Sequence, residues 1–154
     1  MLEEKSEQIL PQKLPKILTL LLMVHGVVNI MIALPLFVTP AKFLRLVGWL
    51  VEDYTVARLL SAAFALVAVI CFNSNSLKPH QACNSLLYLA VWDASVAAVI
   101  FIYLIEAEDD SPVGFPLVIM LFSAVFAVIW IYFRGVILRI VEEAKEASEH
   151  HLLS

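Results

Sequence analysis

Long apolar runs alternate with short polar breaks along this chain, and the runs have the length of membrane-spanning helices. A hydrocarbon core of about 30 Å takes about 20 residues of helix to cross. Four runs fit: Ile17 to Phe37, Thr55 to Phe72, Leu86 to Ile105 and Val113 to Phe133. The pattern predicts an all-α fold, an antiparallel four-helix transmembrane bundle. The first run is too long for a signal peptide and lacks a small-x-small cleavage site before Pro35, so we expect it in the mature protein.

A shorter amphipathic stretch lies between the first two runs. Thr39 and Pro40 are typical of a helix N-cap followed by proline at the first helical position. The following body, Ala41 to Val51, places apolar and basic residues on different sides and is too short to span. This pattern predicts an extracytoplasmic helix lying in the membrane interface between helices 1 and 2.

Both ends of the chain are more polar than its middle. Residues 1–16 mix charges with two prolines and are predicted to form a cytoplasmic surface segment, ahead of the transmembrane domain at 17–134. The last run ends in Trp130, Tyr132, Phe133 and Arg134, an aromatic and then basic exit that predicts a position at the membrane interface. Residues 135–154 are predicted to form a cytoplasmic amphipathic helix and tail.

The overall composition agrees with a membrane protein, since 62% of the 154 residues are hydrophobic and 16% are charged. Its basic residues predict the orientation, because lysines and arginines near the spans are held on the cytoplasmic side. With both termini inside, Lys42 and Arg45 are outside, and the cytoplasmic set is Lys5, Lys13, Lys16, Lys78, Arg134, Arg139 and Lys145. We therefore predict a multi-pass protein of the cell membrane with both termini cytoplasmic.

Small residues recur at helical spacing in the two middle spans. They are Ala57, Ser61, Ala65 and Ala68 in the second span, and Ala90, Ala94 and Ala98 in the third. Small residues at such spacing let two helix backbones approach closely in lipid. We therefore expect the second and third spans to pack on each other.

Polar side chains gather at one depth of the predicted bundle. A carboxylate at the centre of a spanning helix costs about 2.5 to 3.5 kcal/mol, so Asp93 is expected to face the interior and find a partner. At about 1.5 Å per residue, His25, Asn29 and Ser123 fall close to the level of Asp93. Arg58 falls roughly two turns nearer the outer surface.

This polar layer has two interpretations. An aspartate and a histidine in low dielectric can exchange a proton, which would make His25 and Asp93, with Asn29 and Ser123, a ligand-binding or proton-responsive site. The layer can also be a structural hydrogen-bonded network that fixes which helices pair, and we favour this interpretation. For Arg58, we favour a side chain that extends outward to the lipid headgroups over one that pairs with Asp93.

The sequence contains no motif typical of catalysis, metal binding or phosphate binding. Nucleophile motifs, clustered metal ligands and glycine-rich phosphate loops are missing from the sequence, so we predict no enzyme activity, no metal and no cofactor. Cys71 and Cys83 flank a polar turn without a C-x-x-C motif, and they are interpreted as small apolar residues near helix ends. Nothing in the charge pattern supports nucleic-acid binding.

One part of the chain resembles a known family. The run Leu34 to Pro40, then Val47-Gly48-Trp49, then Val56 to Ala63 is similar to small four-helix membrane proteins of the DoxX-like and related uncharacterised types. The similarity covers about Leu34 to Ile70. It implies a first hairpin closed by an outer amphipathic segment, and an Arg-Leu pair followed by small residues in the second span.

Two functions remain open at this point. The first is an accessory or interaction subunit that contacts membrane lipids and works as a homo-oligomer or within a larger membrane complex, as its small-residue faces suggest. The second is a small homo-oligomeric transporter or channel that uses His25 and Asp93 as a proton-responsive site. We favour the first.

Overall fold

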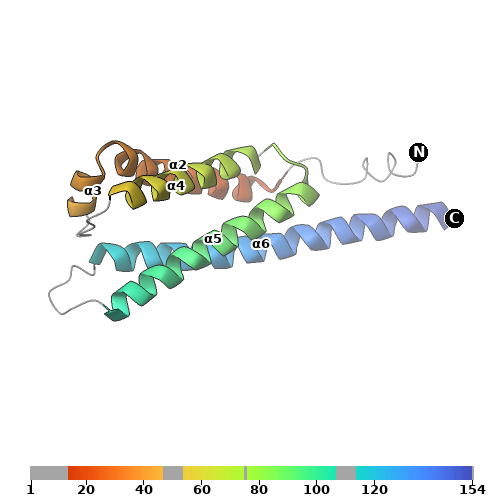
Figure 1. The fold of residues 1–154 in the computed structure, drawn as a ribbon. Helices are drawn as coiled ribbons and strands as arrows, with labels where there is room; N and C mark the ends of the chain where they lie inside the picture. Colours follow the sequence, from red (N-terminus) through yellow and green to blue (C-terminus); the bar gives the residue numbers. More distant parts are fainter. Residues whose placement is uncertain (1–13, 47–53, 75, 107–113, 154) are drawn as a thin grey trace.

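A computed structural model describes residues 14–46, 54–74, 76–106 and 114–153 of the chain. These residues form five helices and no strand: α2 (Lys16–Val38), α3 (Pro40–Leu46), α4 (Tyr54–Ser74), α5 (Pro79–Glu106) and α6 (Gly114–Leu153). Four of them, α2, α4, α5 and α6, are long and apolar enough to span a membrane. The predicted fold class, a bundle of four spanning helices with a short helix after the first, is therefore confirmed (Figure 1).

The spans begin and end close to the predicted residues, with one difference at the start of α5. At the other end, α6 continues past Phe133 into the helix that the sequence predicts at 135–154. Helix α5 starts at Pro79, seven residues before the predicted Leu86, because proline suits a first turn and the Lys78 N–H donates to Gln81 Oε1 at 3.2 Å. Helix α6 continues through Gly135 without a break, and its residue Ile137 is still buried. The predicted cytoplasmic helix at 135–154 is thus an extension of the fourth span, whereas most of the predicted segment 1–16 lies outside the described residues.

Helix α3 is amphipathic, as the sequence predicts. Pro40 and Leu44 are buried, whereas Lys42 and Arg45 are exposed. It begins directly after Thr39, whose carbonyl oxygen accepts the Lys42 and Phe43 N–H groups at 3.1 Å each. The remainder of the predicted helix, 47–51, lies outside the described residues.

The helices pair in an order that differs from the prediction. Helix α2 packs along α4 and helix α5 packs along α6, whereas α4 and α5 have little contact. The expected packing of the second span on the third is therefore wrong. In α4 the small-residue face, with Ala57 and Ala68 buried, belongs to the pair with α2, while Ala94 and Ala98 of α5 are exposed.

Gly26 shows how closely α2 approaches α4. A Cβ atom at Gly26 would lie 3.0 Å from the Phe72 ring and 3.2 Å from Cys71 Cβ. Real Cβ atoms rarely have such close neighbours, so only a hydrogen in place of a side chain fits without a shift. This contact fixes the spacing of the first helix pair.

The two helix pairs share a core over only part of their length. One cluster of buried apolar residues, which includes Leu22, Cys71, Leu89 and Trp130, draws on α2, α4, α5 and α6. A second cluster, at the end of the bundle that carries α3 (the α3 end), is built from Leu36, Leu44 and other residues of α2, α3 and α4. Toward the α3 end the pairs are therefore separated by a cavity, which contains the polar residues described next.

Candidate functional site

His25 lies on the buried side of α2, in line with Leu18, Leu22 and Asn29. These positions repeat at three- and four-residue steps, which place them on one face of a helix. The His25 side chain is 1% exposed, although it comes from a helix that faces lipid on its other side. The packing of α2 on its neighbours therefore holds an imidazole inside the bundle.

Three aromatic rings of α6 surround the His25 imidazole. Phe122, Phe126 and Trp130 are four residues apart and form one stripe along the helix. Their ring centroids lie 6.1, 4.8 and 5.4 Å from that of His25, stacked for Phe122, tilted for Phe126 and edge-on for Trp130. The stripe thus forms a rigid wall that fixes the imidazole against the second helix pair.

Asp93 of α5 meets His25 and Trp130 from the other side. The Trp130 indole Nε1–H donates to Asp93 Oδ2 at 2.8 Å, and both residues are buried. His25 Nε2 lies 3.5 Å from the same oxygen, which is an ion-pair distance but longer than an ordinary hydrogen bond. One carboxyl oxygen therefore connects α5 to α6 by a hydrogen bond and approaches α2 across the bundle.

The described residues give the His25 ring no hydrogen bond, although both its nitrogens are buried. Three other buried polar side chains, those of Asn29, Ser61 and Ser74, bond within their own helix. Ser61 and Ser74 donate to the carbonyls of Arg58 and Ile70, and Asn29 Nδ2 donates to the His25 carbonyl at 2.8 Å. A buried polar group without a partner costs about 1 to 3 kcal/mol, so the imidazole is held at a cost that a bound molecule could offset.

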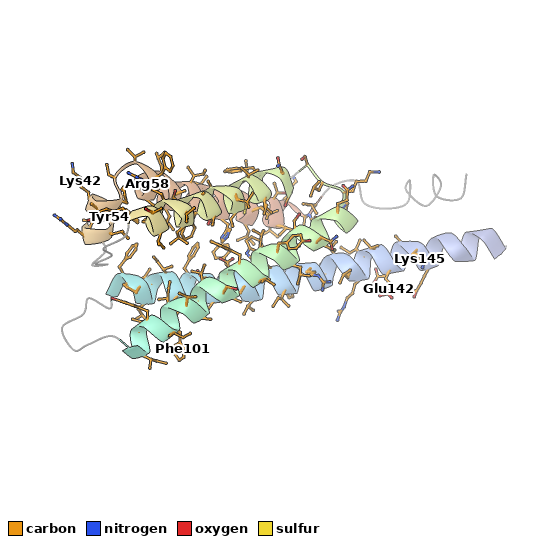
Figure 2. The ribbon with its side chains drawn as sticks, in the orientation of Figure 1. Lys42, Tyr54, Arg58, Phe101, Glu142 and Lys145 are labelled. Atoms are coloured by element: carbon orange, nitrogen blue, oxygen red, sulfur yellow. The ribbon has the colours of Figure 1, made fainter. Side chains whose placement is uncertain are left out.

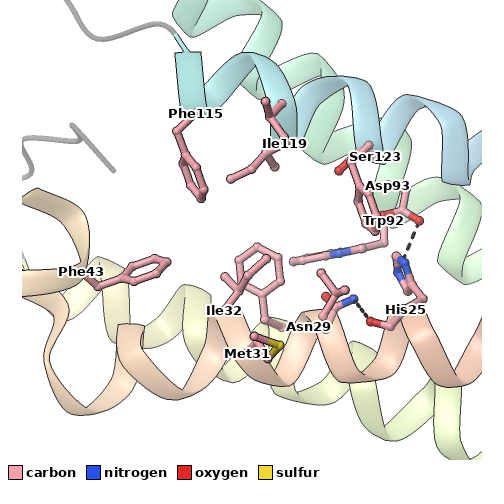
Figure 3. A pocket seen from close by; sticks show the side chains of 14 residues that line it. His25, Asn29, Met31, Ile32, Phe43, Trp92, Asp93, Phe115, Ile119 and Ser123 are labelled. Atoms are coloured by element: carbon pink, nitrogen blue, oxygen red, sulfur yellow. Dashed lines mark hydrogen bonds and ion pairs between the residues drawn. The ribbon is translucent and has the colours of Figure 1, made fainter. Parts of the chain in front are cut away.

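A cavity of about 360 Å³ lies beside this pair (Figure 3). His25, Asn29, Asp93 and Ser123 line its polar end, whereas Phe43 and Phe115 lie at its other end. A second cavity of about 210 Å³ adjoins it and shares six lining residues: Ile32, Phe43, Phe64, Trp92, Phe115 and Ile119. Together they form an apolar space between the helix pairs, with polar groups at one end.

Four of the five candidate residues from the sequence come together here. His25, Asn29, Asp93 and Ser123 all line the larger cavity. Arg58 does not; its side chain is exposed on α4, and Figure 2 shows it with Lys42 and Tyr54 near the α3 end. An exposed Arg58 is compatible with a side chain that extends to the lipid headgroups, and that contact stays a prediction.

The structure places Trp130 differently from the sequence prediction. Its indole is fully buried beside Asp93, not at the membrane interface. The expectation failed because an indole N–H can be paired by a buried carboxylate as well as by headgroups. The spacing of Phe122, Phe126 and Trp130 was the available signal, since a four-residue aromatic repeat indicates a face packed on protein.

The lining of the cavity is mostly apolar and aromatic. No group of three or more histidine, cysteine, aspartate or glutamate side chains is gathered within the described ranges. Cys71 and Cys83 are buried free thiols. What the cavity offers is aromatic surface, a few hydrogen-bonding groups and one acid–base pair.

Comparison with known proteins adds no relative: no family model matches the chain, and neither a curated protein nor a solved structure does. The similarity to DoxX-like proteins remains a prediction. The function has to be argued from the cavity and its residues.

Proposed function

We propose that this small polytopic membrane protein binds a lipophilic molecule in the cavity between its helix pairs, as an accessory subunit and not as an enzyme. The observation that carries the proposal is the buried His25 imidazole, which makes no hydrogen bond within the described residues and lies at ion-pair distance from Asp93 at the end of a 360 Å³ cavity. Ligand sites in proteins are mostly apolar cavities of about 300 to 1,000 Å³ with a few polar groups that orient the ligand. This cavity has that size and that lining.

The cavity is also reachable from the lipid. Met31 of α2 and Val118 of α6 line the cavity and are 69% and 63% exposed. The cavity wall between these two helices therefore continues to the lipid-facing side of the bundle. An apolar molecule dissolved in the bilayer could enter there without crossing water. Filling the space would restore the packing contacts that the lining side chains lack.

The accessory role rests on the outer surface of α5. Ala94 and Ala98 are exposed and one turn apart. Small residues at this spacing favour close packing of another transmembrane helix, from a second copy or from a partner in a larger complex. A survey of co-purifying proteins after gentle solubilisation tests this part, and a chain that stays monomeric and alone would contradict it.

Binding itself is tested by extraction of co-purified molecules. Wild-type protein, purified in lipid nanodiscs, should retain a lipophilic compound that mass spectrometry detects beyond the bulk lipid. Ile119→Trp should lose it, because Ile119 lines both cavities and the indole would fill the shared space. Val125→Trp is the matched control, since Val125 is 56% exposed on the same helix. Equal amounts with both variants would refute the proposal.

A proton-linked transporter is the second candidate, and the His25–Asp93 pair beside an accessible cavity favours it. Such a protein would carry its ligand across the membrane together with a proton. Proteoliposomes with a pH gradient would then show flux that Asp93→Asn abolishes. Retained binding without any gradient-dependent flux would support the accessory role instead.

A further inference from the structure

We propose that the occupant of this cavity is an uncharged long-chain molecule with a hydroxyl end, of the fatty-alcohol class, and that the hydroxyl lies at the polar end. This inference rests on the proposed binding function and specifies its ligand. Three properties of the cavity support it: its charge balance, the hydrogen-bonding groups at its end, and the length and chemistry of its walls.

Charge balance selects an uncharged ligand. His25 and Asp93 are the ionisable residues among the fourteen that line the larger cavity. When Asp93 and His25 hold one proton between them, the pair has no net charge, whether the proton is on the carboxyl group (a neutral pair) or on the imidazole (an ion pair). A ligand carboxylate or ammonium would be compensated only if this pair gained or lost a proton, since the described lining has no other ionisable side chain, whereas an uncharged ligand leaves the pair's charge unchanged.

Hydrogen bonding selects a hydroxyl. Within the described part of the chain, the Ser123 hydroxyl makes no hydrogen bond, and Asp93 is bonded through Oδ2 alone. A ligand hydroxyl can donate to the free carboxyl oxygen and accept from the serine, whereas a carbonyl or ether oxygen can only accept. His25 contributes a further donor and acceptor if its ring turns toward the cavity.

The walls select an apolar chain. From the polar end to the α3 end, the cavity is lined by side chains such as Ile32, Phe64 and Trp92, and it reaches Phe43 and Phe115. Phe115 and Ser123 are eight residues apart on α6, which corresponds to about 12 Å of helix. An extended alkyl chain can therefore follow α6 from the hydroxyl toward α3.

The test compares four probes that share one chain and differ at one end: decanol, decanoate, decylamine and decane. Wild-type protein in phosphatidylcholine nanodiscs is loaded with radiolabelled decanol, with empty nanodiscs as the blank, and each unlabelled probe is added as competitor. Decanol should compete at least about fivefold better than decane, which corresponds to one hydrogen bond. Decanoate and decylamine should also compete less well than decanol.

Two serine variants test the position of the hydroxyl. Ser123→Ala should remove most of the preference for decanol over decane while decane still competes. Ser95→Ala is the control, because the Ser95 hydroxyl already donates to the Val91 carbonyl and lines only the adjoining cavity. An unchanged preference in Ser123→Ala, or an equal loss in both variants, would overturn the placement.

The remaining outcomes show whether the hydroxyl ligand class fails alone or the lipophilic binding function fails as well. Equal competition by all four probes, or best competition by decanoate or decylamine, would overturn the hydroxyl class and leave lipophilic binding intact. If decanol does not bind but Ile119→Trp still loses a co-purified compound, the class is again wrong and the function stands. If no probe binds and Ile119→Trp retains the same material as the wild type, the binding function itself is refuted.

Discussion

The hydrogen bond from Trp130 to Asp93 should be the strongest single link between α5 and α6 at this depth, and a double-mutant cycle can measure it. Trp130→Phe removes the indole donor while keeping an aromatic ring beside His25. Asp93→Leu removes the acceptor at similar volume; asparagine would be a poor choice, because its amide oxygen could still accept. The coupling energy is the stability loss of the double variant minus the losses of the two single variants. It isolates the hydrogen bond, because packing losses that each substitution causes on its own cancel in this difference.

The expected size follows from the 2.8 Å geometry and the burial of both residues. Hydrogen bonds inside membrane proteins average about 0.6 kcal/mol and reach about 1.7 kcal/mol. A bond to an ionised carboxylate is worth about 1.5 to 3 kcal/mol. A coupling near 1 kcal/mol therefore indicates a protonated Asp93, and one above about 2 kcal/mol indicates a carboxylate.

The companion cycle of His25→Phe with Asp93→Leu should give less coupling, because His25 Nε2 lies 3.5 Å from Oδ2 without a hydrogen bond. Free energies of unfolding would be measured by equilibrium titration in mixed detergent micelles. Tyr132→Phe is the control, since Tyr132 is 65% exposed on α6 and should be additive with Asp93→Leu. Additivity of Trp130→Phe and Asp93→Leu within about 0.3 kcal/mol would refute the bond.

Three further predictions concern the packing at Gly26, the exposed Arg58 side chain and the orientation of the chain in the membrane. Gly26→Leu should destabilise the protein by about 1 to 3 kcal/mol in the same titration, whereas Gly135→Leu, with nothing within 4 Å of its Cβ, should be neutral or stabilising; equal losses would contradict the close approach of α2 and α4. Arg58→Gln should change the free energy of unfolding by less than about 0.5 kcal/mol and show no coupling to Asp93, and a measurable coupling would place Arg58 at the pair after all. Ser76→Cys in the α4–α5 turn should be labelled from the cytoplasmic side and Lys42→Cys from the outside, with little background from the buried Cys71 and Cys83; the opposite result would reverse the predicted topology.

The depth of the polar residues could be predicted because a spanning helix fixes height by residue count. His25 and Asp93 come from different spans, and the constant rise of about 1.5 Å per residue placed them at one level before any packing was known. The cost of a lone carboxylate in lipid then required an inward-facing partner. The structure brings their side chains within 3.5 Å, whereas what the pair does remains a prediction.

The pairing of the helices could not be predicted in the same way. In a membrane, lipid and protein interior are both apolar, so a helix carries no clear apolar side that points to its neighbour. The alanines of α4 and α5 indicated that other helices can approach them, but not which ones. One close contact lies at Gly26 of α2, a single glycine that belongs to no repeat, and it brings α2 against Cys71 and Phe72 of α4.

The cavity follows from this pairing. Phe64 of α4 and Trp92 of α5 meet edge to face at 5.4 Å, and both line the space between the pairs. Because α2 pairs with α4 and α5 with α6, the shared core reaches toward the α3 end only as far as Phe126 and its neighbours, and Asp93 and His25 lie beside that boundary in the cavity lining. A purely structural polar link would be best placed inside that core, where its groups could all find partners. Its position at the cavity, with an imidazole that makes no hydrogen bond to any residue that the structure describes, favours a role in holding a ligand.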